Sequence, residues 1–186
     1  GQTSNNGVWC WGANDTAQIG QWFRSDNSST TPIKVGTQSD TPTYFEHLTA
    51  ADQHNCVLTP GGEARCWGAN NHSQLGDGNT NQNVTADPVD TAFNFTSISA
   101  GANDFTCAIN SYGSPMCWGK DEYGQLGDTS SSGDATTPEF VSASPDFAQM
   151  SVGGTFGCAR QTDGTLYCWG DNSDSQLGVD SSTTSE

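Results

Sequence analysis

The chain has 186 residues, with 21 acidic and 5 basic side chains, and its formal net charge is −16 at pH 7. A surface of this charge repels phosphate backbones and anionic membrane surfaces, which argues against a nucleic-acid partner. No apolar run is long enough to span a bilayer, so membrane insertion is not expected. Six tryptophans, 22 glycines and seven cysteines nevertheless indicate an ordered, turn-rich domain rather than a disordered acidic chain.

One pattern recurs four times along the chain. Each copy begins with Cys-Trp-Gly, places a Gln eight residues after the cysteine and places a Gly two residues after the Gln. The copies begin at Cys10, Cys66, Cys117 and Cys168 and lie 56, 51 and 51 residues apart. They divide the chain into one partial unit, 1–31, and three further units, 32–87, 88–137 and 138–186.

Each complete unit carries the same expected elements in the same order. A Pro-x-x-Val-like strand comes first, a β-branched segment such as FTSISAG from Phe95 comes next, and a short strand such as FTCAI precedes the Cys-Trp-Gly strand. No segment has a helical pattern, and turn-forming residues interrupt the chain every ten residues or so. Four short antiparallel strands per unit predict an all-β fold of propeller blades, with about three and a half blades present.

In each complete unit a second cysteine lies ten residues before the Cys-Trp-Gly cysteine, which predicts disulfides within hairpins. If the two cysteines face one another, the hairpin loop has three residues and ends in glycine, as in Pro60-Gly61-Gly62. Facing residues on neighbouring strands lie close enough for a disulfide. Free thiols and zinc ligation are the alternatives, although CxxC pairs and His/Cys sets are absent. The predicted pairs are Cys56–Cys66, Cys107–Cys117 and Cys158–Cys168.

Cys10 has no such partner, because the position facing it would lie just before Gly1. We therefore expect Cys10 to be half of a fourth, truncated disulfide in an excerpt of a longer repeat protein. The alternative is a disulfide between Cys10 and another chain.

The repeated Trp and Gln residues are expected to form the blade scaffold rather than a binding site. An indole ring can fill the space between neighbouring blades where aliphatic side chains are few. The Gln amides are expected to hydrogen-bond backbone of the adjacent loop. The scaffold residues are Trp11, Trp67, Trp118, Trp169, Gln18, Gln74, Gln125 and Gln176.

The motif GxVxCWGxNxxGQLGDG, preceded by an HTCAL-like strand, closely resembles the repeat of the regulator of chromosome condensation family. The best matches are Glu63 to Asp77, Pro115 to Asp128 and Thr165 to Gly178. The resemblance implies a propeller of about seven blades, completed by further copies or by the rest of the same chain. The family includes a nuclear GTPase exchange factor that binds chromatin. This chain is acidic, lacks a basic tail and keeps the HTCAL histidine only as His54.

Paired cysteines suit an oxidising compartment, and the chain resembles the cysteine-paired extracellular members of the family. We therefore predict a non-enzymatic structural or interaction module with a protein partner, located outside the cell or on its surface, in an appendage, matrix or adhesin. The alternatives are a secreted protein-binding inhibitor and, more remotely, a GTPase exchange factor. The inhibitor would use exposed aromatic residues at one end of the propeller. These are Trp22, Phe23, Tyr44 and Tyr123.

Motifs typical of catalysis are absent from the sequence. GxSxG, HExxH, a P-loop and GxGxxG do not occur, so no enzymatic activity, cofactor or metal is expected. A weak calcium alternative is the turn DGNTNQN, in which Asp77, Asn79 and Asn81 stand at alternate positions. Glycosylation sequons lie at Asn14, Asn27, Asn71, Asn83 and Asn94.

Overall fold

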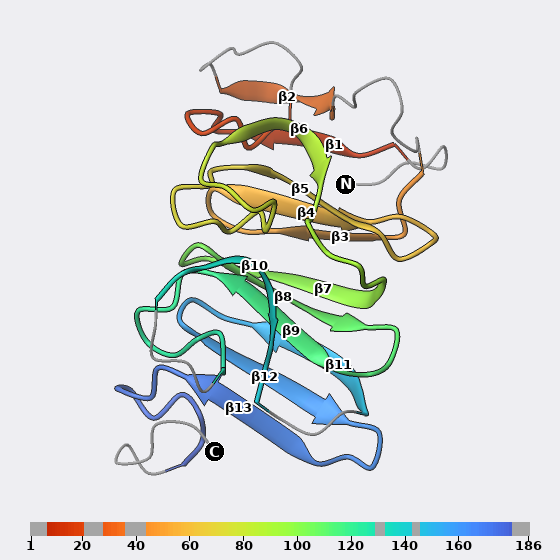
Figure 1. Cartoon of the computed structure of the whole chain (residues 1–186). Helices are drawn as coiled ribbons and strands as arrows, with labels where there is room; N and C mark the ends of the chain where they lie inside the picture. Colours follow the sequence, from red (N-terminus) through yellow and green to blue (C-terminus); the bar gives the residue numbers. More distant parts are fainter. Residues whose placement is uncertain (1–6, 21–27, 36–43, 129–132, 143–145, 180–186) are drawn as a thin grey trace.

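A computed structural model describes residues 7–20, 28–35, 44–128, 133–142 and 146–179 (Figure 1). These residues form thirteen β-strands. Within the same ranges, no helix is long and apolar enough to cross a membrane. The described part of the chain therefore has the all-β architecture that the strand pattern predicts.

The strands form four antiparallel sheets, which we number as blades in chain order. Blade 1 contains β1 (Trp9–Gly12) and β2 (Ser29–Lys34). Blade 2 contains β3 (His47–Ala50), β4 (His54–Leu58), β5 (Ala64–Gly68) and β6 (Asn83–Pro88). Blade 3 contains β7 (Phe95–Gly101), β8 (Phe105–Asn110), β9 (Pro115–Gly119) and β10 (Ala135–Phe140). Blade 4 contains β11 (Phe147–Val152), β12 (Phe156–Gln161) and β13 (Leu166–Gly170).

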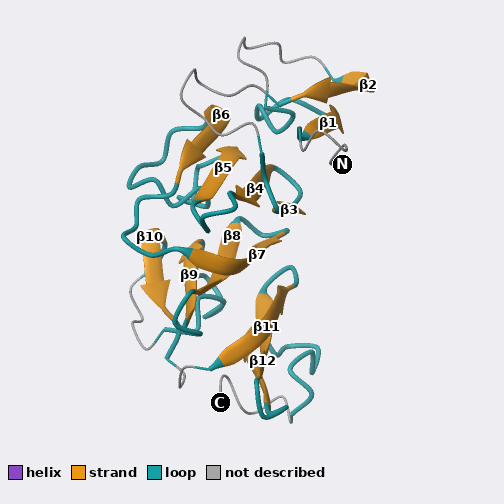
Figure 2. Cartoon of the chain, turned by 90° about the vertical axis from the view of Figure 1, so that its right-hand side faces the viewer, coloured by secondary structure: helices purple, strands orange, loops and turns teal. Residues whose placement is uncertain are grey.

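The blades are stacked in chain order, from blade 1 at the top of Figure 1 to blade 4 at the bottom, and Figure 2 shows the same succession. The first strand of one blade contacts the first strand of the next, β3 with β7 and β7 with β11. Side-chain oxygens join these strands: Ala100 N donates to Thr49 Oγ1 at 3.0 Å, and Val152 N donates to Ser99 Oγ at 3.2 Å. This succession of antiparallel sheets, of which blades 2 and 3 have four strands each, is that of successive propeller blades.

The Pro-x-x-Val-like segments are the outer strands of the preceding blade, and do not open the next one. Pro88, for example, pairs with Arg65 of β5, and β7 follows only after the linker that leaves β6. The unit boundaries expected at 31/32, 87/88 and 137/138 therefore fall inside β2, β6 and β10. The length of the predicted unit matches that of a blade, but the unit starts too early in the sequence. Its first strand is the last, outer strand of the preceding blade, and the chain enters the next blade only after that strand.

Each complete hairpin holds its cysteines face to face. The disulfides Cys56–Cys66, Cys107–Cys117 and Cys158–Cys168 have Cα–Cα distances of 4.2, 4.1 and 4.1 Å, as in a non-hydrogen-bonded cross-strand pair. In the first hairpin, Thr59 N donates to Glu63 O at 2.9 Å, which closes a three-residue loop. Gly62 ends this loop with a φ of 82°, the left-handed conformation that the loop requires.

The hydrophobic core lies largely between blades. One cluster of buried side chains runs from blade 2 through blade 4 and contains Trp118 and Trp169, and a second joins blades 1 and 2 around Trp67. Burial of these rings, together with the disulfides, offsets the shortage of aliphatic side chains.

Candidate functional site

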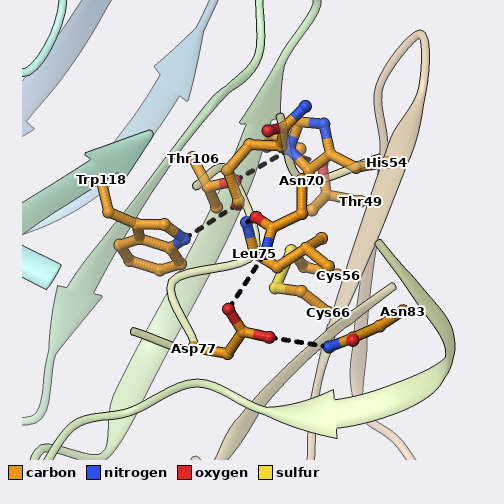
Figure 3. Close-up of a disulfide and its surroundings, with 12 residues drawn as sticks. Thr49, His54, Cys56, Cys66, Asn70, Leu75, Asp77, Asn83, Thr106 and Trp118 are labelled. Atoms are coloured by element: carbon orange, nitrogen blue, oxygen red, sulfur yellow. Dashed lines mark hydrogen bonds between the residues drawn. A yellow bond between two sulfur atoms is a disulfide. The ribbon is translucent and has the colours of Figure 1, made fainter. Parts of the chain in front are cut away.

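The joint between two blades is built around one tryptophan. Trp118 of blade 3 is fully buried and donates its Nε1–H to the main-chain carbonyl of Gln74 in blade 2, at 3.0 Å (Figure 3). The same bond recurs at the other two joints, from Trp67 to Gln18 O at 3.0 Å and from Trp169 to Gln125 O at 2.9 Å. Trp11, by contrast, is 57% exposed.

The glycine two residues after each Gln makes room for the indole. A Cβ at Gly76 would lie 2.7 Å from Trp118 Nε1, closer than real Cβ contacts. A Cβ at Gly20 would lie 2.9 Å from Trp67 Nε1, and one at Gly127 would lie 2.6 Å from Trp169 Cδ1. The Gln-x-Gly spacing therefore has a structural cause. The main-chain carbonyl of the Gln accepts the hydrogen bond of the indole, and the Gly two residues later leaves space for the indole ring.

The Gln side chains mainly support their own turns, whereas the sequence analysis expected them to bind the adjacent loop. Gln74 Oε1 accepts a hydrogen bond from His72 N at 2.9 Å, and Gln18, Gln125 and Gln176 repeat this contact two residues upstream. Gln74 Nε2 also reaches blade 3, where it donates to Asp104 Oδ1 at 2.9 Å. Blade contact thus depends chiefly on the main chain of the Gln.

The residue before the first hairpin cysteine supplies a second donor to the same carbonyl. Asn55 Nδ2 donates to Gln18 O at 2.8 Å, and Thr106 Oγ1 donates to Gln74 O at 2.9 Å. Blade 4 has Gly157 at this position, so the side-chain donor is absent there. At the middle joint His54 Nε2 lies 2.9 Å from Thr106 Oγ1, and burial lowers the pKa of His54 to about 4. In the sequence, His54 is distinguished only as the histidine of the HTCAL motif, which gives no sign of this contact.

In the loop after β5, the oxygens suggested as calcium ligands already accept hydrogen bonds from the side-chain amide of Asn70. Asn70 Nδ2 donates to Asp77 Oδ1 at 3.0 Å (Figure 3). Asn79 O and Asn81 O also lie 3.0 Å from Nδ2, so the three oxygens share the two hydrogens of one amide group. Asn70 Oδ1 accepts from Leu75 N at 3.0 Å, which fixes the orientation of the amide. In the described ranges, no group of three or more His, Cys, Asp or Glu could hold a metal ion.

One end of the blades collects acidic side chains. We define the acidic loop end as the turns after β3, β7 and β11 with the loops after β5, β9 and β13. His72 Nδ1 contacts Asp134 Oδ2 at 2.7 Å across the joint between blades 2 and 3, and Asp121 N donates to Asp134 Oδ1 at 3.3 Å. Burial raises the pKa of Asp121, and repulsion from Asp128 and Asp134 raises it further. Burial also raises the pKa of Asp104.

The predicted aromatic binding residues do not share one end. Tyr44 precedes β3 and is 42% exposed, whereas Tyr123 follows β9 and is 47% exposed, so the two lie at opposite ends of the strands. Trp22 and Phe23 fall outside the described residues. Three further exposed apolar side chains lie at the hairpin end with Tyr44, namely Tyr112, Phe140 and Leu166, whereas exposed Val179 follows β13 at the acidic loop end. None of these four was predicted from the sequence.

An open cleft of about 380 Å³ lies at the hairpin end, between blades 2 and 3. Glu46, His47 and Thr59 line one side, and Asn94 and Thr96 line the other. Its lining is mixed, with Leu58 and Phe95 among the polar groups.

The sequons and Cys10 occupy varied environments. Asn14 is 4% exposed and its Oδ1 accepts from Ile19 N at 3.2 Å, so it is poorly placed for a glycan. Asn71 and Asn94 are exposed, Asn83 is half-buried, and Asn27 falls outside the described residues. Cys10 is a half-buried free thiol whose pKa is raised by burial.

Comparisons with known proteins agree with the blade architecture. Models of the regulator of chromosome condensation (RCC1) repeat match residues 47–74, 117–160 and 147–176. The human E3 ubiquitin-protein ligase HERC2 is 26% identical over 92% of this chain, which spans 4% of HERC2. The human X-linked retinitis pigmentosa GTPase regulator is 27% identical over 89% of this chain, which spans 16% of that protein.

Solved propellers have the same fold. Human WBSCR16 superposes with a TM-score of 0.80 at 22% identity, covering 91% of this chain and 44% of its own. Yeast RCC1 (Prp20) bound to Kap60 superposes with a TM-score of 0.76 at 17% identity, covering 94% of this chain and 42% of its own. The chain thus spans less than half of these structures.

The predicted extracellular or cell-surface location is wrong, because HERC2, the X-linked retinitis pigmentosa GTPase regulator and yeast RCC1 (Prp20), which the chain matches, are intracellular proteins. That prediction rested on the paired cysteines. Their pairing reflects the register of the hairpins, which does not by itself determine the compartment. The repeat matches, the blade topology and the recurring Trp-to-Gln joint lead to one conclusion: the chain contains regulator of chromosome condensation repeats, folded as successive blades of that propeller.

Proposed function

We propose that the chain is a protein-interaction module that binds a basic segment of a partner protein through its acidic loop end. The observation that carries the proposal is the excess of acidic over basic side chains in the loops of this end. In the described loops of the acidic end, the basic side chains are His72 and Lys120, which contact Asp134 and Glu122 at 2.7 and 2.9 Å. The acidic residues of this end include Asp52, Asp104, Asp121, Glu122, Asp134, Asp171 and Asp174.

The joints hold these loops in place, so their charges are preorganised for a partner. Gln74 binds Asp104 across the joint, and Asp121 Oδ1 accepts from Leu126 N at 2.9 Å within its own loop. The raised pKa values of Asp104 and Asp121 mean that their carboxylates are poorly solvated. A basic segment would offset the poor solvation of these two carboxylates by neutralising their charge.

A protein partner also agrees with the structural relatives. Yeast RCC1 (Prp20) has been solved bound to Kap60, and its binding to Gsp1p and histones has been described with its structure. Those partners belong to that protein. For this chain they support protein interaction, and the charge of the loop end supports the choice of a basic segment.

Fluorescence anisotropy with a labelled lysine-rich peptide tests the proposal. The double variant Glu122→Gln/Asp134→Asn should weaken binding several-fold at low salt, with a smaller effect at physiological salt. The matched control, Glu46→Gln/Asp163→Asn, removes the same charge at the hairpin end and should leave the affinity nearly unchanged. Equal losses in both variants would mean that net charge alone attracts the peptide, and the proposal would fail.

The absence of enzymatic activity stays a prediction, as does the remote alternative of GTPase exchange. A nucleotide-release assay with a panel of small GTPases tests exchange directly. If this chain accelerates nucleotide release from a GTPase, its function is nucleotide exchange rather than protein binding alone.

A further inference from the structure

The middle joint contains an ionisable group at a position that is phenylalanine in the other blades. His54 stands two residues before the first hairpin cysteine of blade 2, where blades 3 and 4 have Phe105 and Phe156. The imidazole is fully buried, with 0% exposure, and its Nε2 lies 2.9 Å from Thr106 Oγ1 of blade 3 (Figure 3). His54 therefore links two blades through a side chain that can change its charge.

The positions of the hydrogens follow from the bonds around Thr106. Its hydroxyl has a single hydrogen, which goes to Gln74 O because a carbonyl can only accept. Thr106 Oγ1 must then accept from His54, so the Nε2 atom of His54 carries the ring hydrogen. The Nδ1 atom carries a lone pair, and it is buried with no hydrogen-bond partner.

Protonation of His54 would therefore act on an atom that the joint leaves unpaired. A hydrogen on Nδ1 would have no acceptor, and the imidazolium charge would be buried without a counter-ion, which is unfavourable. Burial is accordingly the single cause of the low pKa of His54, about 4 against an ordinary 6.5.

The charged and titratable groups on the surrounding elements do not compensate this charge. None of them makes a hydrogen bond to the imidazole among the described contacts, and none shifts its pKa. They are His47 on β3, Asp52 in the β3–β4 turn, Arg65 on β5, His72 and Asp77 in the loop after β5, and Asp104 in the β7–β8 turn.

We propose that His54 is a proton-operated latch, which keeps the joint between blades 2 and 3 closed while the imidazole is neutral and releases it locally on acidification. The open joint exposes the imidazole to water, where it binds a proton with its ordinary pKa. The equilibrium constant for opening should therefore rise on the order of a hundredfold between pH 7 and pH 4. The joints at Trp67 and Trp169 contain no histidine and should stay closed.

The three buried indoles report on the three joints in a single experiment. Hydrogen exchange of the indole Nε1–H groups, followed by NMR in the folded chain, measures how readily each joint opens. Relative to Trp67 and Trp169 at the same pH, the protection of the Trp118 Nε1–H against exchange should fall on the order of a hundredfold between pH 7 and pH 4, beginning below about pH 6.5. A ratio of protection that does not change with pH, because Trp118 does not respond or because all three indoles respond equally, would overturn the proposal.

His54→Phe is a matched variant, because it installs the side chain that blades 3 and 4 already use. It should abolish the pH response of Trp118. His54→Gln keeps a donor for Thr106 without a titratable ring and should have the same effect. A response that persists in either folded variant would assign the acid sensitivity to another group and refute the latch. If neither variant folds, the comparison of the three wild-type indoles decides.

Discussion

The indole of Trp118 lies so close to Gly76 that a Cβ on residue 76 would come within 2.7 Å of its Nε1. Gly76 also has a φ of 69°, which an L side chain tolerates poorly. We expect Gly76→Ala to lower the free energy of unfolding by about 2–4 kcal/mol, from backbone strain and overpacking together. Chemical denaturation measures this loss.

Gly124→Ala is the control for that experiment. Gly124 has nearly the same φ, 72°, but a Cβ there would have no neighbour within 4 Å. Gly124→Ala should therefore lower the free energy of unfolding only through backbone strain, by about 1 kcal/mol. Equal losses of unfolding free energy in the two variants would show that the indole of Trp118 moves to make room for the added methyl group.

The Trp-to-carbonyl bond should matter most where the carbonyl has no second side-chain donor. At the middle joint Gln74 O also accepts from Thr106, so Trp118→Phe should cost about 1 kcal/mol. At the last joint Gly157 offers no donor to Gln125 O, so Trp169→Phe should cost about 2–3 kcal/mol by leaving a buried acceptor unpaired. Thermal or urea unfolding of the two variants gives the comparison, and the reverse order would contradict it.

The three disulfides should differ in their accessibility to reductant. Both cysteines of the Cys56–Cys66 and Cys107–Cys117 pairs are 0% exposed, whereas Cys158 and Cys168 are half-buried. Because exchange requires attack by an external thiolate, Cys158–Cys168 should be reduced first. Timed alkylation followed by peptide mass spectrometry would show Cys158 and Cys168 labelled before the others. Simultaneous labelling would indicate that reduction follows global unfolding.

Asn70 should not tolerate a carboxylate, although Asp121 holds the same position in blade 3. Asn70→Asp would replace the donor to Asp77 Oδ1 by an anion and should lower stability by about 2–4 kcal/mol at neutral pH. Acidification should restore part of the loss by protonating the new carboxyl. The control, Asp121→Asn, keeps the acceptor for Leu126 N and relieves repulsion, so it should be neutral or stabilising.

Glu139 and Glu122 should respond to pH with opposite signs. Burial, and then Asp128, raise the pKa of Glu139 above its unfolded value, so its stabilisation is present in acid and is lost as the pH rises through the folded pKa. Glu139→Gln should therefore stabilise the chain at neutral pH and lose this advantage in acid.

Lys120 lowers the pKa of Glu122, so the stabilisation from that pair is present at neutral pH and is lost in acid. Glu122→Gln should slightly destabilise the neutral protein, and the difference should vanish as the pH falls. Denaturation curves at several pH values test both variants. If the stability changes caused by Glu139→Gln and Glu122→Gln varied with pH in the same direction, the opposite pKa shifts of the two side chains would be excluded as the cause.

The fold could be predicted from the sequence because its signals are local or periodic. The ten-residue cysteine spacing and the glycine that ends each loop specify the hairpin around Cys56 and Cys66, and the motif period specifies the succession of blades. The joint could not be predicted in full, because its acceptor is a main-chain carbonyl that any residue would supply. The role of His54 depends on a partner 52 residues away, Thr106. The separation of Tyr44 and Tyr123 depends on strand direction, which composition does not reveal.

The use of Gln74 O as the acceptor has a consequence for the origin of such chains. Each repeat carries the carbonyl and glycine that receive the next indole, together with the indole that the previous repeat receives. A duplicated or deleted segment that spans one whole repeat would leave every internal joint complete, whatever side chain stands in place of the Gln. Blade number can therefore change by recombination without a matching change at any second site, whereas a cut inside a repeat would leave an indole and its carbonyl unmatched.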